Sequence, residues 1–181
     1  MDWESILGQR PIVVAIAGSN GAGKSTFYHA HLADAGLRFV NADDIADELD
    51  LGAYEAADLA AAIRRELAKS GESFIFETVL SDPHGAKVTE LNEIGQKGIH
   101  VVLIFIRIDS PDTSKQRVSM RVMQGGHDVP DDKLESRFER TLVNLDRAIA
   151  TLPVVLVLDN SDLSRPYRLE AVFRDSKRIS P

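Results

Sequence analysis

The stretch from residue 12 to residue 36 constrains the fold of this chain more than any other. It begins with the apolar run IVVAIA (12–17), continues through GSNGAGKS (18–25) and ends in KSTFYHAHLADAG (24–36), which has helical composition. A buried strand, a turn of the form G-x-x-x-x-G-K-[ST] and a helix, in this order, form a loop that cradles phosphate groups. At average composition the motif would arise by chance in well under about one in a hundred chains of this length.

Each residue type in the motif has a physical role. The glycines let backbone N–H groups approach phosphate oxygens, Lys24 reaches the β and γ oxygens, and the Ser25 hydroxyl is the predicted ligand of Mg²⁺. The N-terminus of the following helix adds a positive dipole. The motif therefore predicts that ATP or GTP, with ATP favoured, binds with Mg²⁺ at Gly18, Ser19, Asn20, Gly21, Ala22, Gly23, Lys24, Ser25 and Thr26.

The rest of the chain alternates between strand and helix patterns. Short apolar runs at 73–77, 101–106 and 154–159, with a weaker one at 38–40, are typical of strands buried on both faces of a parallel sheet. Helical periodicity appears at 59–67, from Asp82-Pro83 to Gly98, from Ser110-Pro111 onward, and at 131–150. We therefore predict a three-layer α/β fold with a mostly parallel five-stranded sheet, in which residues 1–181 form one domain. The stretch 167–175 is expected to add an edge strand.

Composition excludes several classes of protein. A formal net charge of −7 argues against general nucleic-acid binding, which requires a basic surface. No apolar run approaches the roughly 20 residues of a membrane-spanning helix, and the first residues lack the basic start of a secretory signal. The chain has no cysteine, so disulfide and thiolate chemistry are excluded. We expect a cytoplasmic protein with neither a membrane nor a nucleic acid as its partner.

Acidic residues follow the predicted strands, where ligands of an open parallel sheet bind. Asp43 comes directly after the strand at 38–40 and is suited to accept the proton of an acceptor hydroxyl. The alternative for Asp43 is to cap a helix that begins at Ile45, a position for which Asp44 is better placed. Asp159 ends the last apolar strand, and we interpret it as part of a strand and turn rather than as a magnesium ligand.

A cationic segment lies between residues 112 and 137. Arg117 and Arg121 are four residues apart on one helical face, and Gly125-Gly126 separates that helix from the next, which carries Arg137. Two cation-bearing helices around a Gly-Gly hinge are typical of a lid that closes over phosphates. The alternative is a solvated helical hairpin whose arginines pair with neighbouring acids.

Together these stretches resemble the zeta toxin family, in the compact branch described as predicted ABC-type ATPases. The resemblance lies in GSNGAGKST, NADDIA (41–46), FETVLS (76–81) and RVMQGGHDVPDDKLESRFERTLVNL (121–145). It implies a P-loop kinase-like fold and transfer of the γ-phosphoryl group of ATP, with magnesium, to a hydroxyl of UDP-N-acetylglucosamine. No LSGGQ-like stretch supports the ABC part of that description.

Carried over by position, the resemblance implies a role for several residues. Asp43 would be the general base, Lys24 and the arginines 117, 121 and 137 would stabilise the transferring phosphoryl group, and Glu77, Thr78, Ser81 and His127 would line the acceptor site with Asp43. His127 stands where the family carries its second lid arginine, and histidine is a poorer phosphate clamp than arginine. Either Arg137 replaces that arginine, or the reaction and acceptor differ from those of the toxins.

The sequence leaves three functions open. The leading hypothesis is a phosphotransferase with an alcohol group as acceptor, such as a sugar nucleotide. The second is an ATP-binding switch that acts on a protein partner and has no small-molecule acceptor. The third is a kinase for a nucleoside, nucleotide or antibiotic, because P-loop kinases share this architecture. The resemblance also implies an antitoxin protein as a partner.

Overall fold

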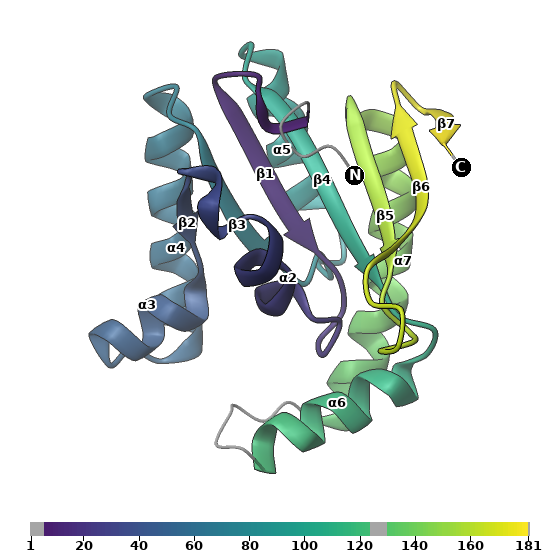
Figure 1. Cartoon of the computed structure of the whole chain (residues 1–181). Coiled ribbons are helices and arrows are strands. Elements are labelled where there is room, and N and C mark those ends of the chain that lie inside the picture. Colours follow the sequence, from purple (N-terminus) through teal and green to yellow (C-terminus); the bar gives the residue numbers. More distant parts are fainter. Residues whose placement is uncertain (1–5, 124–129, 181) are drawn as a thin grey trace.

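A computed structural model describes residues 6–123 and 130–180 of the chain (Figure 1). The strands are β1 (Ile12–Ala17), β2 (Arg38–Val40), β3 (Phe74–Thr78), β4 (His100–Arg107), β5 (Val154–Asp159), β6 (Arg168–Arg174) and β7 (Lys177–Ser180). The helices are α2 (Lys24–His31), the 3₁₀ helix η1 (Ala33–Ala35), α3 (Ala42–Leu49), α4 (Ala53–Lys69), α5 (Ala86–Gln96), α6 (Pro111–Met123) and α7 (Asp131–Thr151).

The strands form one sheet in the order β2-β3-β1-β4-β5-β6-β7. The first five strands of this order are parallel to one another, and β6 and β7 are antiparallel additions at one edge. The expected α/β fold with a mostly parallel sheet is confirmed. The sheet has seven strands rather than five, because β6 joins the edge as expected and the exposed KRIS stretch folds back on it as β7.

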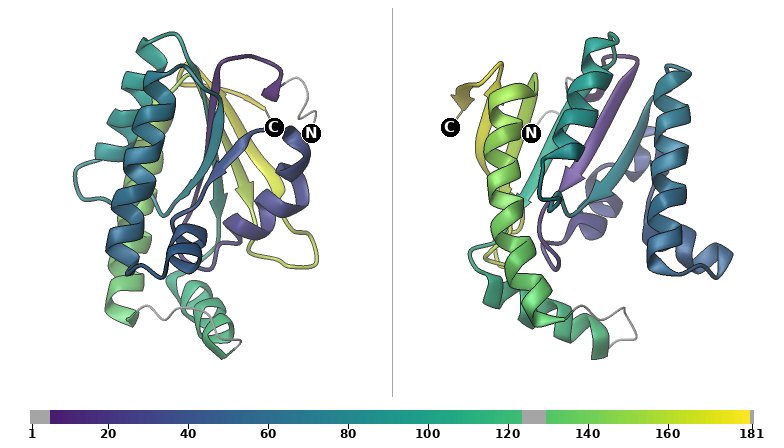
Figure 2. Two further views of the ribbon diagram at one scale, coloured as in Figure 1. Left: turned by 90° about the vertical axis from the view of Figure 1, so that its left-hand side faces the viewer. Right: turned by 180° about the vertical axis from the view of Figure 1, so that it is seen from behind.

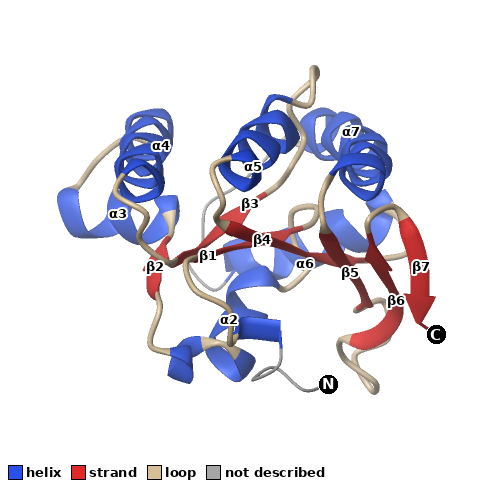
Figure 3. Cartoon of the chain, turned by 90° about the horizontal axis from the view of Figure 1, so that it is seen from above, coloured by secondary structure: helices blue, strands red, loops and turns tan. Residues whose placement is uncertain are grey.

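Two layers of helices cover the sheet. Figure 3 shows α4, α5 and α7 on one side of the strands and α2 on the other. The central strand β1 is buried along its whole length, and its alternate residues belong to the two core clusters: Val13, Ala15 and Ala17 face the first, and Ile12, Val14 and Ile16 face the second. Because such a strand is buried on both faces of the sheet, its sequence is a continuous apolar run and does not alternate between apolar and polar residues.

Two helices begin at residues other than those expected. Helix α3 starts at Ala42, and Asn41 caps it by accepting a hydrogen bond from the N–H of Asp43, so neither Asp43 nor Asp44 is the cap. Helix α5 starts at Ala86 and not at Pro83. The carboxylate of Asp82 still caps it, but it does so from four residues upstream, where Oδ1 accepts from the N–H of Ala86 at 2.5 Å.

The carboxyl ends of the parallel strands meet at one edge of the sheet. In Figure 1 the arrows of β1, β3 and β4 point downward to this edge, and α6 lies beneath it. Figure 2 shows from two further sides that α6 and the start of α7 extend beyond the sheet at the same end. Within the described residues, no helix is long and apolar enough to cross a membrane.

Candidate active site

The phosphate loop connects the carboxyl end of β1 to the first residue of α2. Gly18, Gly21 and Gly23 all have positive φ, at 149°, 73° and 94°. A Cβ atom at Gly18 would lie 2.3 Å from the carbonyl oxygen of Ile106, so no larger residue fits without displacing β4. In the part of the chain that the structure describes, no side chain caps the N-terminus of α2. The loop therefore fits a phosphate group, because the first amides of α2 face the loop as hydrogen-bond donors.

Three side chains from distant parts of the sequence hold this loop in place. Asn160 Nδ2 donates to the carbonyl oxygen of Ala22 at 2.8 Å, and the Tyr167 hydroxyl donates to that of Gly23 at 3.0 Å. From α6, the Ser114 hydroxyl donates to the carbonyl oxygen of Asn20 at 2.7 Å. Sequence reasoning missed all three residues, because each lies more than 90 positions from its partner and belongs to no motif.

Lys24 lies at the centre of the charges at this edge. Its Nζ donates to the carbonyl oxygens of Gly18 and Ser19, both at 3.1 Å. Burial lowers the pKa of Lys24, the charges of Glu77 and Asp43 oppose that fall, and the charge of Arg121 adds to it. The structure thus brings Lys24, Glu77, Asp43 and Arg121 within electrostatic range of one another.

Glu77, at the end of β3, connects the phosphate loop to the start of α3. The Ser25 hydroxyl donates to its Oε2 at 3.2 Å, and Asn41 Nδ2 donates to its Oε1 at 3.4 Å. Burial raises the pKa of Glu77; Lys24 and the Ser25 hydroxyl oppose that rise, whereas Asp43 and Asp44 add to it. Asn41 links Glu77 to Asp43, since its side-chain oxygen Oδ1 accepts a hydrogen bond from the N–H of Asp43 at 3.0 Å.

Asp43 lies in the first turn of α3 with its side chain exposed to solvent. Its backbone is fixed by the Asn41 cap, and its carboxylate is near enough to influence the titration of both Lys24 and Glu77. An exposed carboxylate beside a half-buried lysine and a half-buried glutamate can accept a proton from a solute that enters from solvent.

Thr78 and Ser81 belong to a loop that helix α7 holds in place. The Thr78 hydroxyl accepts from the N–H of Leu80 at 3.1 Å, and the Ser81 carbonyl accepts from Arg140 Nε at 2.8 Å. Asn144, buried in α7, donates from Nδ2 to the carbonyl oxygens of Leu80 and of Asp82, both at 2.8 Å. The predicted acceptor loop therefore has a fixed backbone beside Glu77.

Arg117 lies against the phosphate loop in a way that the sequence did not predict. Its NH2 donates to the carbonyl oxygens of Asn160 at 2.8 Å and Ser161 at 3.0 Å, and its NH1 donates to that of Gly21 at 3.5 Å. These contacts join α6, the loop after β5 and the phosphate loop. They favour a positioning role for Arg117 in place of the predicted contact with a transferring phosphoryl group.

The remaining lid residues are only partly described. Arg121 is exposed on α6, one turn beyond Arg117, and Arg137 is half-buried on α7. His127 and the Gly125-Gly126 hinge lie outside the described residues.

Two further acids at the strand ends have local partners. Asp159 accepts hydrogen bonds from Ser161 and from Arg168, and Asp109 accepts one from the Thr113 hydroxyl at 2.6 Å. Burial alone would raise the pKa of Asp159, but the bonds from Ser161 and Arg168 outweigh it and hold the pKa at about 2. Both acids stabilise the turn or helix start in which they lie.

Comparison with known proteins identifies a family for this chain. The sequence model described as Zeta toxin matches residues 40–171, well over half of the chain. No curated protein matches the sequence significantly.

Solved structures with the same fold include toxins and kinases. The AvrRxo1-ORF1:AvrRxo1-ORF2 complex with ATP aligns with a TM-score of 0.72 and 20% identity over 97% of this chain and 62% of that one. The PezAT chromosomal toxin–antitoxin system of Streptococcus pneumoniae aligns at 0.66 and 15% identity over 91% and 72%. A gluconokinase from Sinorhizobium meliloti 1021 aligns at 0.52 and 20% identity over 88% and 86%.

The chain spans about three fifths of the length of the AvrRxo1 protein that it matches. Its fold is shared with a gluconokinase. With a family match over residues 40–171, the chain belongs to the zeta toxin family.

Proposed function

We propose that this protein transfers the γ-phosphoryl group of ATP to a hydroxyl group of a small molecule, with a sugar nucleotide such as UDP-N-acetylglucosamine as the leading candidate acceptor. The observation that carries the proposal is the convergence of four side chains at one edge of the sheet. Lys24, Ser25, Glu77 and Asp43 come from three separate elements and influence one another through hydrogen bonds or charge. A phosphate-binding lysine, two oxygen ligands and an exposed carboxylate are the groups that phosphoryl transfer to an alcohol requires.

In the proposed reaction, the phosphate loop binds ATP and two side chains beside it bind the metal ion. Backbone N–H groups of residues 18–26 and Nζ of Lys24 hold the phosphate chain of ATP, and the lysine exchanges its two carbonyl partners for phosphate oxygens. Ser25 and Glu77, whose oxygens lie 3.2 Å apart, would hold Mg²⁺ directly or through water. When bound, Mg²⁺ supplies positive charge that offsets the negative charge on the β and γ phosphates.

Asp43 acts as the base in the transfer step. The acceptor oxygen forms a bond to the γ-phosphorus while the bond from that phosphorus to the bridging oxygen of ADP breaks, and the acceptor proton passes to Asp43. Arg121 and Arg137 are the proposed cations over the transferring group. Support for Arg121 comes from its charge, which already acts on Lys24.

The experiment is an assay of ATP consumption with Mg²⁺ against a panel of acceptors. The panel contains UDP-N-acetylglucosamine, other sugar nucleotides, nucleosides, nucleotides and aminoglycosides. Turnover that requires a sugar nucleotide supports the proposal. Turnover with a nucleoside or an antibiotic would identify that molecule as the acceptor in place of a sugar nucleotide. Tight ATP binding with no acceptor-dependent turnover would overturn the proposal in favour of a nucleotide-dependent switch.

We also infer an antitoxin protein as a partner, because the PezAT toxin–antitoxin system shares this fold. To inhibit the transfer reaction, that partner would have to cover the nucleotide site. Expression of the protein alone in a host tests whether it needs such a partner. The protein produced alone should arrest growth of its host, and Asp43→Asn should relieve that arrest. If the wild-type protein and Asp43→Asn affect growth equally, the inference is wrong.

A further inference from the structure

A cavity of about 550 Å³ lies at the end of the sheet opposite to the phosphate loop. Its lining comes from the end of α5, the first residue of β4, the end of α7, the loop into β5 and the turn between β6 and β7. In Figure 1 this is the upper end of the sheet, where β4 and β5 begin. Small-molecule sites typically have volumes of about 300–1,000 Å³, so the cavity has the size of a site for a small organic ligand.

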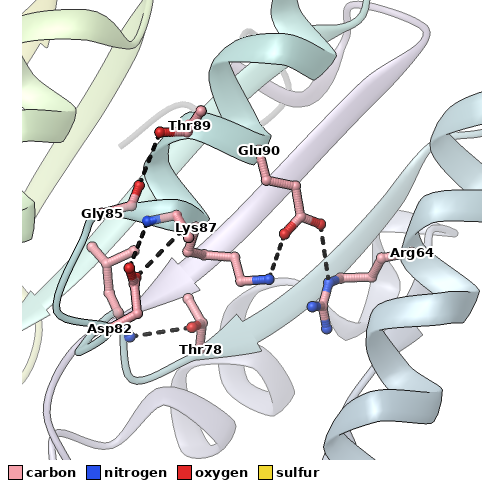
Figure 4. Close-up of polar contacts among 9 residues, drawn as sticks. Arg64, Thr78, Asp82, Gly85, Lys87, Thr89 and Glu90 are labelled. Atoms are coloured by element: carbon pink, nitrogen blue, oxygen red, sulfur yellow. Dashed lines mark hydrogen bonds and ion pairs between the residues drawn. The ribbon is translucent and has the colours of Figure 1, made fainter.

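Two helices end in the wall of this cavity. The last residue of α5, Gln96, and the last residue of α7, Thr151, both line it. The final carbonyl groups of a helix have no partner within the helix, and they carry the negative end of its dipole. Figure 4 shows the opposite end of α5, where the carboxylate of Asp82 accepts from the N–H of Lys87 at 3.4 Å. The cavity therefore lies at the negative ends of two helices.

Asp175 adds a full negative charge to the wall. It lies in the tight turn between β6 and β7, where its N–H donates to the carbonyl oxygen of Pro153 at 3.0 Å. The Ser176 hydroxyl donates to the carbonyl oxygen of Ala150 at 3.0 Å, so the turn is fixed against the end of α7. Among the described residues that line the cavity, Asp175 is the only acid, His100 is the only base, and none is a lysine or an arginine.

Apolar side chains supply another part of the lining. Ile99 and Leu152 line the cavity and are only 5% and 2% exposed. The side-chain amides of Asn92 and Gln96 add hydrogen-bonding groups. The lining therefore suits a molecule that has an apolar body and a positively charged end.

We propose that this cavity binds a small organic amine, in which a protonated amino group is attached to an aromatic or aliphatic body. The ammonium group lies against Asp175 and the helix ends, because a carboxylate and the C-terminal end of a helix both stabilise a cation. The body of the ligand packs against Ile99 and Leu152, which removes apolar surface from water. The site is separate from the phosphate loop and the acceptor loop, so the inference stands or falls independently of the proposed kinase function.

Calorimetric titration with tyramine tests the chemical class of the ligand. The protein is first saturated with a non-hydrolysable ATP analogue and Mg²⁺, so that the phosphate loop is occupied. Tyramine should bind with a Kd of about 0.1–1 mM, which is consistent with the affinity that so small a ligand can reach. 4-Ethylphenol, which lacks the amino group, should bind at least about tenfold more weakly, and 4-hydroxyphenylacetate, which carries a carboxylate instead, should not bind measurably.

Three variants test whether tyramine binds in this cavity. Gly95 lines the cavity, and a Cβ atom there would lie 3.7 Å from Cγ2 of Val101, an ordinary contact, so Gly95→Leu places a side chain at the cavity wall without a backbone clash. Asp175 has a φ of 48°, and Asp175→Asn keeps the turn because asparagine also adopts this conformation. Gly95→Leu should abolish tyramine binding, and Asp175→Asn should weaken it by at least about tenfold. Glu93→Gln, an exposed change on α5 outside the lining, should have no effect.

Thermal unfolding of the same variants separates loss of the site from loss of the fold. Gly95→Leu should melt at the wild-type temperature or above it, because leucine is more favourable than glycine in a helix. Failure of tyramine to bind the wild-type protein would overturn the inference, and equal binding of tyramine and 4-ethylphenol would overturn the assignment to amines. Wild-type affinity in both Gly95→Leu and Asp175→Asn, or equal weakening in Asp175→Asn and Glu93→Gln, would show that tyramine binds elsewhere and would also refute the site.

Discussion

The contacts of Arg117 make a prediction that separates two roles for this arginine. Replacing Arg117 by Met keeps most of the aliphatic stem and removes the guanidinium. The change deletes two close hydrogen bonds from a charged donor, to the carbonyl oxygens of Asn160 at 2.8 Å and Ser161 at 3.0 Å, and a longer one to that of Gly21. The phosphate loop and the loop after β5 then lose their link through α6 and keep the direct hydrogen bond from Asn160 Nδ2 to the carbonyl oxygen of Ala22.

The expected loss of stability follows from these bonds. Hydrogen bonds that involve a charged group contribute about 1.5–3 kcal/mol each. Because Arg117 is half-buried and both close bonds use one nitrogen, we take about 2–3 kcal/mol for the pair. A change of 1 kcal/mol shifts the Tm of a chain of this size by about 2–4 °C, so Arg117→Met should lower the Tm by about 4–12 °C.

Calorimetry and steady-state kinetics measure the two consequences together. Arg117→Met should lower the Tm and weaken ATP binding, with a modest effect on kcat. Arg174→Met, an exposed change at the opposite end of the sheet, is the matched control and should leave both unchanged. The reasoning is refuted if Arg117→Met leaves the Tm unchanged and lowers kcat by about 10³–10⁵-fold, which is the effect of removing an arginine that contacts the transferring phosphoryl group.

Three further predictions concern titration and packing. Because burial raises the pKa of Glu77, the folded protein loses stability as the pH rises above the ordinary glutamate value, and Glu77→Gln should be more stable than wild type in urea at pH 7 but not at pH 4. Arg168→Met should raise the pKa of Asp159 from about 2, and NMR titration of the carboxyl group measures that change. As the pH falls, the variant should therefore lose the stability that the ionised carboxylate contributes at a less acidic pH than wild type does. Leu91→Ala should cost about 2–5 kcal/mol by urea unfolding, because Leu91 is 0% exposed, whereas Leu163→Ala at 68% exposure should cost little; equal effects would contradict the packing described here.

Local patterns predicted the parts of the fold that depend on local sequence. The bounds of β1, β2 and β5 agree with their apolar runs. β1 and β5 are buried where the chain crosses the core, whereas in the edge strand β2 only Val40 is buried. The start of α5 was wrong because the Asp-Pro pair was read as a cap and first turn, whereas the carboxylate of Asp82 caps from outside the helix. Strand β7 was missed because all four of its residues are exposed and it pairs only through a tight turn at residues 175–176.

Contacts between distant segments account for what the sequence could not show in the site. Asn160 and Tyr167 hold the phosphate loop from 138 and 144 residues away, so no local motif contains them. Arg117 and Arg121 look equivalent on one helical face, yet the structure gives Arg117 carbonyl partners after β5. The link from Ser25 through Glu77 to Asn41 joins three motifs that the sequence identified separately.

The most direct test of the account is transfer of labelled phosphate from [γ-³²P]ATP to the acceptor, compared in wild type, Asp43→Asn and Asp44→Asn. The two aspartates are neighbours in the first turn of α3 and both are exposed, so each variant removes one carboxylate from nearly the same place. The account predicts that Asp44→Asn still labels the acceptor, whereas Asp43→Asn binds ATP normally and does not. Equal labelling by Asp43→Asn and Asp44→Asn would contradict the assignment of Asp43 as the base and with it the proposed mechanism.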